Sequence, residues 1–482
     1  MSTPEPTEVD VLVIGAGLSG IDAAYRLQTD CPGKTFAILE GRTALGGTWD
    51  LFRYPGIRSD SDMFTLGYPF RPWERPNAIA EGAEILTYLQ DTAREFGIDR
   101  RIRYDRHVTS ASWSSATASW TVTAAGADTT HTYTCRFLYV CTGYYSYAAG
   151  HTPDFPGRDR FRGTVIHPQH WPEDLDCSGK RVVVIGSGAT AVTLVPALAH
   201  TAAHVTMVQR SPTYVSVAPA ADPMMRALNP ILSKRQLANA VRWRNLLLGT
   251  IFYQFTRRCP DHARALLRKV TERQLAGSSV PADPHFTPAY APWDQRVCLA
   301  PEGDLFRALS SERASIVTDR IASFTESGIA LESGGHVDAD IVVTATGLRV
   351  VAAGDIDVTV DGASVALRDT FAYRGVMYSG LPNFGWCLGY TNASWTLRAD
   401  LSSRYMCRVI NHLDATGHDF AVPVLGEHRP VPRPLLGLTS GYVRRAEQVL
   451  PKQSDRAPWL MRQNYLLDGL EFGHRTRAPM PA

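Results

Sequence analysis

A buried strand, a glycine-rich turn and a helix follow one another twice in this chain, and this repeat limits the fold more than any other feature. The first copy runs from an apolar segment at 9–14 through Gly15, Gly17 and Gly20 into a helical pattern at 21–27. Such a turn lets backbone N–H groups and the positive end of a helix meet a diphosphate. The next apolar segment ends in Glu40, where an acid binds ribose hydroxyls. The first unit is therefore predicted to bind a dinucleotide.

The second copy differs at the position of this acid. An apolar strand at 180–185 leads into a turn over 186–191, and the following strand ends in Gln209, Arg210 and Ser211. Without an acid nothing repels a 2′-phosphate, and the Arg210 guanidinium can pair with one. The second unit is predicted to prefer NADP(H), with Ser211 and Lys180 as further contacts. The alternative for Arg210 is a solvated charge at a strand end.

Two dinucleotide units in one chain favour a relay in which one holds FAD and the other brings NADPH. Strands at 137–141 and 340–344 each run into Thr-Gly and would carry the chain from one unit to the other. The predicted fold class is α/β, with two Rossmann-like (doubly wound) dinucleotide-binding domains, the NADP domain inserted in the FAD domain, and a helical insert. The predicted bounds are 1–145 and 348–482 for the FAD-binding domain with the C-terminal segment, 146–215 and 287–347 for the NADP-binding domain, and 216–286 for the insert.

The composition excludes several classes of protein. With 49 Lys and Arg against 47 Asp and Glu, the net charge of +2 gives no basis for binding nucleic acid. The 8 Cys show no CxxC spacing, so neither a disulfide scaffold nor a metal site is expected. The sequence contains no signal-peptide pattern and no apolar run of about 20 residues, so a cytoplasmic protein is expected.

Two further motifs lie near the dinucleotide units. At 46–60 the sequence contains Gly46-Gly47-Thr48-Trp49 and ends in Asp60. Glycines let the backbone approach a flat ring, and the aromatic side chains supply a rigid apolar wall. The second motif, at 161–172, consists of Phe161, Gly163, His167, Trp171 and Pro172.

The second motif, F-x-G-x-x-x-H-x-x-x-W-P, resembles the signature of the type I Baeyer–Villiger monooxygenases. Residues 46–60 resemble another signature of that family, G-G-x-W-x-x-x-x-[FY]-P-G-x-x-x-D, and the likeness extends to about residue 465. The resemblance implies an enzyme that uses FAD, NADPH and O2 to insert one oxygen atom into apolar or aliphatic ketones. Esters or lactones would form through a C4a-peroxyflavin, with side oxidation of sulfides and thioamides.

The resemblance also implies catalytic residues. Arg296 matches the mobile active-site arginine of the family, and Asp60 matches the carboxylate that orients it. Positive charge at this point stabilises an oxyanion as it develops. The alternatives are a solvated charge for Arg296 and a turn cap for Asp60. Where the family often has a lysine that grips the 2′-phosphate, this chain has Gln295, which leaves the strictness for NADPH open.

The candidate binding residues fall into three groups. The residues expected to bind FAD are Gly15, Gly17, Gly20, Glu40, Gly47, Thr48, Trp49 and Asp60. The residues expected to bind NADPH are Gly186, Gly188, Ala189, Thr190, Ala191, Arg210 and Ser211. Tyr390, Asn392 and Trp395 are candidates for a substrate tunnel, with core packing as the alternative. His167 and Trp171 are expected to position the domain hinge rather than to act chemically.

The segment 224–275 carries 11 Lys and Arg against 2 acidic residues. The favoured interpretation is that it packs on the NADP domain with a solvated cationic face, and the alternative is peripheral contact with anionic lipid. Two other functions compete with the leading one, an N- or S-oxygenase without ester formation and a membrane-surface NADPH sensor. A flavin disulfide reductase was excluded because Cys135 and Cys141 do not form a redox pair near a flavin.

Overall fold

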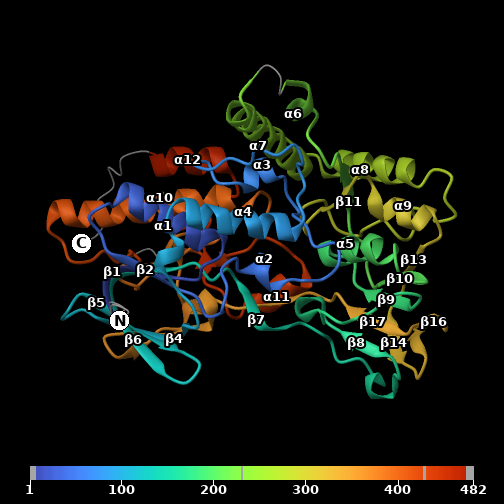
Figure 1. The fold of residues 1–482 in the computed structure, drawn as a ribbon, viewed down its shortest axis with the longest axis horizontal. Coiled ribbons are helices and arrows are strands. Elements are labelled where there is room, and N and C mark those ends of the chain that lie inside the picture. Colours follow the sequence, from blue (N-terminus) through green and yellow to red (C-terminus); the bar gives the residue numbers. More distant parts are fainter. Residues whose placement is uncertain (1–6, 229–231, 427–429, 474–482) are drawn as a thin grey trace.

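Two separate β-sheets organise the protein, and helices pack around both of them (Figure 1). The computed structural model describes residues 7–228, 232–426 and 430–473. Within these residues the larger sheet runs in the order β20-β19-β4-β5-β6-β1-β2-β3. Its strands are β1 (Glu8–Ile14), β2 (Phe36–Leu39), β3 (Ile102–Arg103), β4 (His107–Ser114), β5 (Ser119–Ala125), β6 (Thr130–Val140), β19 (Asp357–Val360) and β20 (Ala363–Ser364), joined through β6 by β21 (Ala372–Tyr373), β22 (Met377–Tyr378) and β23 (Phe384–Trp386).

Strand β1 lies at the centre of this sheet because its apolar residues are covered on both faces. It runs parallel to β2 and β6, with Val11 opposite Phe36 and Phe137. Leu12 and Val13 are fully buried. Helix α1 (Leu18–Asp30) follows the first glycine turn and packs against the long helix α10 (Trp395–Thr416). The amino end of α1 is thereby fixed at the carboxyl edge of the sheet, where dinucleotides bind in such folds.

The smaller sheet is parallel throughout and repeats the same plan. Its order is β13-β10-β9-β17-β8, in which β9 (Arg181–Ile185) is the strand before the second glycine turn. The other strands are β8 (Thr164–Ile166), β10 (His204–Gln209), β13 (Ala314–Thr318) and β17 (Ile341–Thr344). Helix α5 (Ala189–Leu198) follows the turn and packs on this sheet, as does α9 (Asp304–Ser310).

The chain crosses between the two sheets at a small two-stranded ribbon. Strand β7 (Tyr145–Gly150) leads out of the larger sheet, and β18 (Leu348–Val350) leads back into it; the two pair antiparallel. All strands of the smaller sheet therefore lie in sequence between two parts of the larger one. The predicted fold class, with one dinucleotide domain inserted in the other, is confirmed. The exact domain bounds stay predictions.

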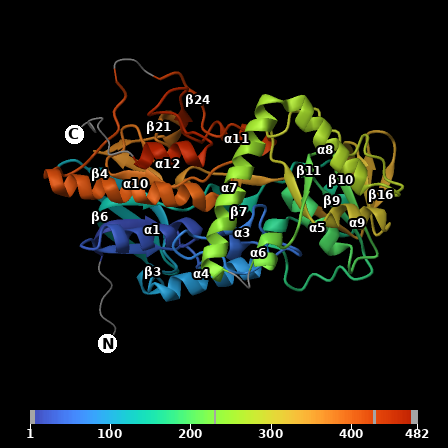
Figure 2. The same cartoon turned by 90° about the horizontal axis from the view of Figure 1, so that it is seen from above.

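The helical insert contains α6 (Pro223–Leu228), α7 (Lys234–Arg258) and α8 (Pro260–Gln274) and stands out from the body (Figures 1 and 2). Helix α8 packs beside β11 (Val215–Ala218), which pairs with β12 (Cys298–Pro301) near the NADP domain. Helix α7 instead packs on α3 (Met63–Leu66), where buried Arg242 donates to the carbonyl oxygens of Phe64 and Gly67 at 2.8 and 2.6 Å. The insert thus packs near the NADP domain through α8, as expected, and it also packs on the FAD part through α7, which was not expected.

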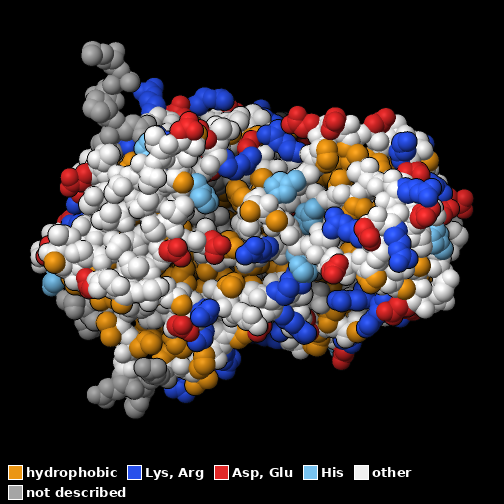
Figure 3. All heavy atoms as spheres, turned by 90° about the horizontal axis from the view of Figure 1, so that it is seen from below, with side chains coloured by type: hydrophobic (Ala, Val, Ile, Leu, Met, Phe, Trp, Pro, Cys, Tyr) orange, Lys and Arg blue, Asp and Glu red, His pale blue; other side chains and the backbone are white. Residues whose placement is uncertain are grey.

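The remaining elements lie outside the two sheets. No helix in the described ranges is long and apolar enough to cross a bilayer. The further helices and strands are α2 (Thr48–Leu51), α4 (Gly82–Glu95), α11 (Gly441–Ala446), α12 (Tyr465–Gly473), β14 (Ile321–Phe324), β15 (Gly328–Leu331), β16 (His336–Asp338), β24 (Arg433–Pro434) and β25 (Lys452–Gln453). On the side away from α7, apolar and cationic side chains gather near the middle of the molecule, between the parts built on the two sheets (Figure 3).

Candidate active site

One cavity of about 690 Å³ runs from the first glycine turn to the amino end of α5. Its walls come from the FAD part (Gly17, Glu40), from the crossover ribbon (Tyr145) and from the NADP part (Thr190). A single space therefore joins the two dinucleotide positions, as electron transfer between two cofactors requires.

The three glycines of the first turn do different work. A Cβ at Gly20 would lie 1.9 Å from the Gly15 carbonyl oxygen, and one at Gly15, where φ is +99°, would lie 2.8 Å from the Cys141 carbonyl oxygen. Both positions are dictated by the protein's own packing. A Cβ at Gly17 would lie 3.5 Å from its nearest neighbour, the Cα of Gly47, which is ordinary contact. Gly17 therefore leaves the backbone at the cavity wall open to close approach by a ligand, because no side chain projects there.

Glu40 closes the same turn from the end of β2. Its carboxylate accepts hydrogen bonds from the backbone N–H of Ala16 at 2.8 Å and of Arg42 at 3.0 Å. Burial raises the pKa of Glu40, and the two N–H donors act against this rise. The side chain lines the cavity, where a ribose hydroxyl can reach it.

The segment after β2 forms a second rim of the cavity. Gly47 has φ of +57° and a buried backbone, and Thr48 and Trp49 open the short helix α2 beside it. Buried Asp50 ties the rim together, because Arg42 and Arg53 reach its two oxygens at 2.7 and 2.9 Å. All the predicted FAD residues from Gly47 to Trp49 line the cavity.

The second turn repeats the division of labour among glycines. A Cβ at Gly186, where φ is +136°, would lie 2.3 Å from the Ala345 carbonyl oxygen, whereas a Cβ at Gly188 would meet no described atom within 4 Å. Ala191 replaces the third glycine and is fully buried against the sheet. Ala189 and Thr190, at the start of α5, line the cavity.

Arg210 and Ser211 follow β10 at the same edge of the sheet, and both are exposed. The Ser187 hydroxyl donates to the Ser211 carbonyl oxygen at 2.8 Å, which holds this loop against the glycine turn. Lys180, expected beside them, precedes β9 and therefore lies at the opposite edge. At about 3.3 Å per residue, five residues of strand place it more than ~15 Å away, so that expectation was wrong.

Arg296 and Asp60 meet in the cavity as an ion pair. The Arg296 Nη1 donates to the Asp60 Oδ2 at 2.5 Å, and the side chains remain 36% and 44% exposed. The Asp60 carboxylate raises the pKa of the Arg296 guanidinium, which stays charged. Arg296 therefore faces the cavity in contact with Asp60, and the catalytic roles of the two residues stay predictions.

Aromatic side chains missed by sequence reasoning surround this pair. Tyr144 stacks on Trp395 with ring centroids 5.3 Å apart, and its hydroxyl lies 2.9 Å from the Tyr145 hydroxyl. Burial raises the pKa of both tyrosines, so their hydroxyls stay neutral. Tyr147, from the same crossover strand, lines the flavin end of the cavity, and burial raises its pKa to about 12.

The three candidates for the substrate tunnel separate in the structure. Tyr390 and Trp395 line the cavity, and the Trp395 Nε1 donates to the Ser19 hydroxyl at 2.8 Å. Asn392 instead donates to the Gln463 carbonyl oxygen at 3.0 Å, away from the cavity lining. Its position supports the C-terminal segment rather than a tunnel wall.

The residues of the 161–172 motif hold the crossover region together. The His167 Nε2 lies 3.1 Å from the Gly347 carbonyl oxygen beside β18, and its Nδ1 accepts from the Gln169 N–H at 3.1 Å. A Cβ at Gly150, in β7, would collide with the His167 ring at 2.0 Å. Burial lowers the pKa of His167, so it is neutral. These contacts are the positional ones expected of this residue.

The other motif residues pack within the NADP part. Phe161 is buried edge-on against Phe324, and a Cβ at Gly163 would lie 2.3 Å from the Asp340 carbonyl oxygen. Trp171, next to Pro172, is half-buried against the core of the same domain.

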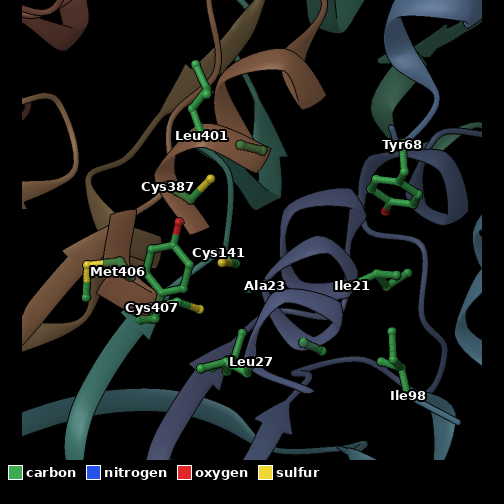
Figure 4. Close-up of a cluster of buried hydrophobic side chains, with 14 of the residues drawn as sticks. Ile21, Ala23, Leu27, Tyr68, Ile98, Cys141, Cys387, Leu401, Met406 and Cys407 are labelled. Carbon is green, nitrogen blue, oxygen red and sulfur yellow. The ribbon is translucent and has the colours of Figure 1, made fainter. Parts of the chain in front are cut away.

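Two cysteines that are far apart in sequence meet behind the first glycine turn. Cys141, which lines the cavity, lies beside Cys387 in the core behind the first turn (Figure 4). Both thiols are free and buried, and contact with Cys141 lowers the pKa of Cys387. A cysteine pair near the flavin position therefore exists, formed by residues far apart in sequence. The spacing of Cys135 and Cys141 in the sequence therefore does not by itself exclude a flavin disulfide reductase.

Comparisons with known proteins agree with this geometry. The family described as flavin-binding monooxygenase-like matches residues 58–224, and an NAD(P)-binding Rossmann-like domain matches residues 13–76. The FAD-containing monooxygenase EthA of Mycobacterium tuberculosis is 50% identical over 461 residues, covering 95% of this chain and 94% of the relative. The probable FAD-binding monooxygenase AlmA of Acinetobacter baylyi is 46% identical over 463 residues, covering 95% and 93%.

Solved structures share the fold. A steroid monooxygenase bound to NADP aligns with a TM-score of 0.72 at 28% identity, over 87% of this chain and 88% of that one. Cyclohexanone monooxygenase aligns with a TM-score of 0.73 at 22% identity, over 86% and 90%.

The fold and site define a flavoprotein monooxygenase with separate FAD and NADP positions. The chain belongs to the family of FAD-containing monooxygenases that includes EthA and AlmA. It is an oxidoreductase that uses FAD and NADPH, and O2 and an organic substrate are its further reactants. The open backbone at Gly17 and the carboxylate of Glu40 fit FAD, and the open turn at Gly188 fits NADPH. A sensor without turnover has no support.

Proposed function

We propose that the protein is a Baeyer–Villiger monooxygenase that converts apolar ketones into esters or lactones and also oxidises accessible sulfides. The observation that carries the proposal is the Arg296–Asp60 ion pair, set in a cavity lined by both the FAD part and the NADP part. The likeness to a steroid monooxygenase of known structure supports it.

When bound, FAD reduced by NADPH supplies oxygen activated from O2. Arg296 contributes a fixed positive charge at the place where negative charge grows on the carbonyl oxygen of the ketone. A charge held in position before the reaction stabilises the transition state more than it stabilises the neutral substrate. Asp60 holds the guanidinium by one oxygen, at 2.5 Å, and leaves other N–H donors for the substrate.

The aromatic wall suits the same reaction. Trp395, stacked on Tyr144, and half-buried Trp49 present apolar surface to the cavity, which excludes water and accepts an aliphatic chain. Exclusion of water protects a reactive oxygen donor from decay to hydrogen peroxide. The Tyr144 and Tyr145 hydroxyls remain neutral donors beside the Arg296 charge.

The experiment compares two oxidations in separate incubations. Purified protein with NADPH and air is given a medium-chain 2-alkanone or an aryl methyl sulfide, and products are separated by gas chromatography. The proposal predicts an ester from the ketone and a sulfoxide from the sulfide. Sulfoxide without ester, across a series of ketone chain lengths, would favour the N- or S-oxygenase instead.

A further inference from the structure

Helix α7 exposes a row of large apolar side chains. Trp243, Leu247, Leu248 and Ile251 are 53%, 45%, 56% and 64% exposed. At about 100° per residue, these four positions fall within an arc of roughly 140° on the side away from the protein. The opposite side of the helix packs on the protein and buries Ala238, Arg242 and Leu246. Arg244 also falls within the outward arc, where it is tied to Asp222 by an ion pair.

Helix α12 extends the same surface. The rings of Trp243 and Tyr465, the first residue of α12, lie 6.5 Å apart. Leu467 and Leu470 of α12 are 45% and 60% exposed. Figure 2, a view from above, shows α7 running through the middle of the view, with α12 to its left. We call these six side chains (Trp243, Leu247, Leu248, Ile251, Leu467 and Leu470) the α7–α12 face.

Positive charge flanks the face. Helix α7 contains Lys and Arg but no Asp or Glu. Lys234 and Arg235, at its start, and Arg258, at its end, are exposed and form no ion pair with another described residue. Arg258 lies fifteen residues after Trp243, which places it about 60° round the helix and inside the apolar arc.

We propose that the α7–α12 face rests on the surface of an anionic lipid bilayer. Exposed aliphatic side chains and a tryptophan between cationic ends are what an interfacial helix needs, because the apolar groups enter the acyl boundary while the cations meet phosphate groups. No described helix can span the bilayer, so the contact is peripheral. A contiguous exposed apolar patch of this kind marks an interaction site.

The face also adjoins the cavity. Leu246, on the inner side of α7, packs in one cluster with Tyr390, and Tyr465 of α12 packs against that cluster. Tyr390 in turn lines the cavity. If the proposed function holds, an apolar ketone dissolved in the bilayer reaches the site across this single layer of side chains. The lipid contact itself does not depend on that function.

The test is co-sedimentation of the full-length holoenzyme with vesicles of phosphatidylcholine alone or of phosphatidylcholine mixed with anionic phosphatidylglycerol. We expect binding to anionic vesicles at least tenfold tighter than to neutral ones, falling as salt is raised. The double variant Leu247→Glu with Ile251→Glu should lose most of this binding. Val424→Glu, at a residue 57% exposed on a loop outside both helices, is the matched control and should bind as the wild type does.

Turnover of a short, water-soluble substrate serves as the check on folding and should be equal in all three proteins. Equal vesicle binding by the double variant and the wild type would overturn the proposal. The proposal would also be overturned if the wild type ignored anionic lipid and was a dimer, while the double variant was a monomer, because the face would then join two copies. An inactive protein that still binds vesicles would count against the proposed function alone.

Discussion

The Arg296 guanidinium donates to the Asp60 carboxylate at 2.5 Å although 236 residues separate the two in sequence. Asp60 follows the flavin-side rim, and Arg296 lies just before β12, between the helical insert and the smaller sheet. The pair therefore exists only when both dinucleotide parts are docked. This relationship links the fold to the chemistry, because the charge sits where both cofactor positions open into one cavity.

Replacing Arg296 should separate flavin reduction from oxygen insertion. In Arg296→Ala, reduction of FAD by NADPH should stay within about threefold of the wild type, whereas ester formation should fall by roughly 100- to 1000-fold, as on loss of an oxyanion donor. Stopped-flow absorbance and product analysis measure the two steps. Arg257→Ala is the matched control, since Arg257 also pairs with an aspartate, Asp294, at 2.6 Å and does not line the cavity. Wild-type ester yield in Arg296→Ala would remove Arg296 from the mechanism.

The glycines should divide into ligand positions and packing positions. Gly17→Ala should fold but be purified with little FAD, because the new methyl group enters the cavity rather than the protein. Gly188→Ala should keep its FAD and raise the KM for NADPH. Gly20→Ala should fail to fold, since its Cβ would lie 1.9 Å from the Gly15 carbonyl oxygen. Flavin absorbance per protein and circular dichroism distinguish these results; full FAD content in Gly17→Ala would contradict the assignment.

Arg210 should set the preference for NADPH over NADH. Loss of a charge-assisted contact to the 2′-phosphate should lower kcat/KM for NADPH roughly 10- to 100-fold in Arg210→Ala and leave that for NADH nearly unchanged. Lys180→Ala should not alter the ratio, because Lys180 lies at the other edge of the sheet. Steady-state kinetics with both cofactors provides the measurement. A ratio that moves only in Lys180→Ala would mean that the cofactor does not lie across β9 and β10 as assigned.

Asp22 should make stability fall as pH rises. It is fully buried on α1, and burial followed by the nearby Asp400 raises its pKa well above the ordinary 3.8. The folded protein therefore holds a proton that the unfolded chain releases above that value, so the wild type loses stability from about pH 4 upward until Asp22 ionises in the fold. The variant Asp22→Asn has no group that titrates at this position. The melting temperature of this variant should therefore rise relative to that of the wild type as the pH is raised from 5 to 8.

A control with the opposite sign is available on the surface. Asp361 accepts hydrogen bonds from the Ser115 N–H and hydroxyl, both at 2.7 Å, and these contacts lower its pKa. The stability that Asp361 contributes is complete above the pKa that this residue has in the unfolded chain, and it is lost only as the pH falls below that pKa. Asp361→Asn should therefore lower the stability by the same amount at pH 5 and at pH 8. A constant difference between Asp22→Asn and the wild type over this range would show that Asp22 does not titrate there.

Features defined by consecutive residues could be predicted from the sequence, whereas contacts between residues far apart in the chain could not. The two glycine turns, Glu40 and the end of β10 could be predicted because a few consecutive residues define each unit. The closeness of Arg296 and Asp60 came from a family resemblance and not from spacing. Lys180 was misplaced although strand direction alone puts it at the wrong edge of the sheet.

The aromatic wall and the core contacts had no such local signal. Tyr144 comes directly before the crossover strand β7 and Trp395 begins α10, and only the docking of these elements stacks the two rings. Cys141 and Cys387 meet for the same reason, since β23, just before Cys387, pairs with β6, just before Cys141. The exposed apolar residues of α7 could not be assigned to one surface from the sequence, because only the structure shows which side of the helix points outward.

The central claim is that one atom of O2 enters a ketone, and oxygen-18 tests it most directly. The protein is incubated with NADPH, 18O2 and a medium-chain 2-alkanone, and the ester is analysed by mass spectrometry. The account predicts an ester with one 18O atom at the ether position, formed in proportion to the NADPH consumed. Consumption of NADPH with hydrogen peroxide as the only product of O2, across ketones of different lengths, would contradict it.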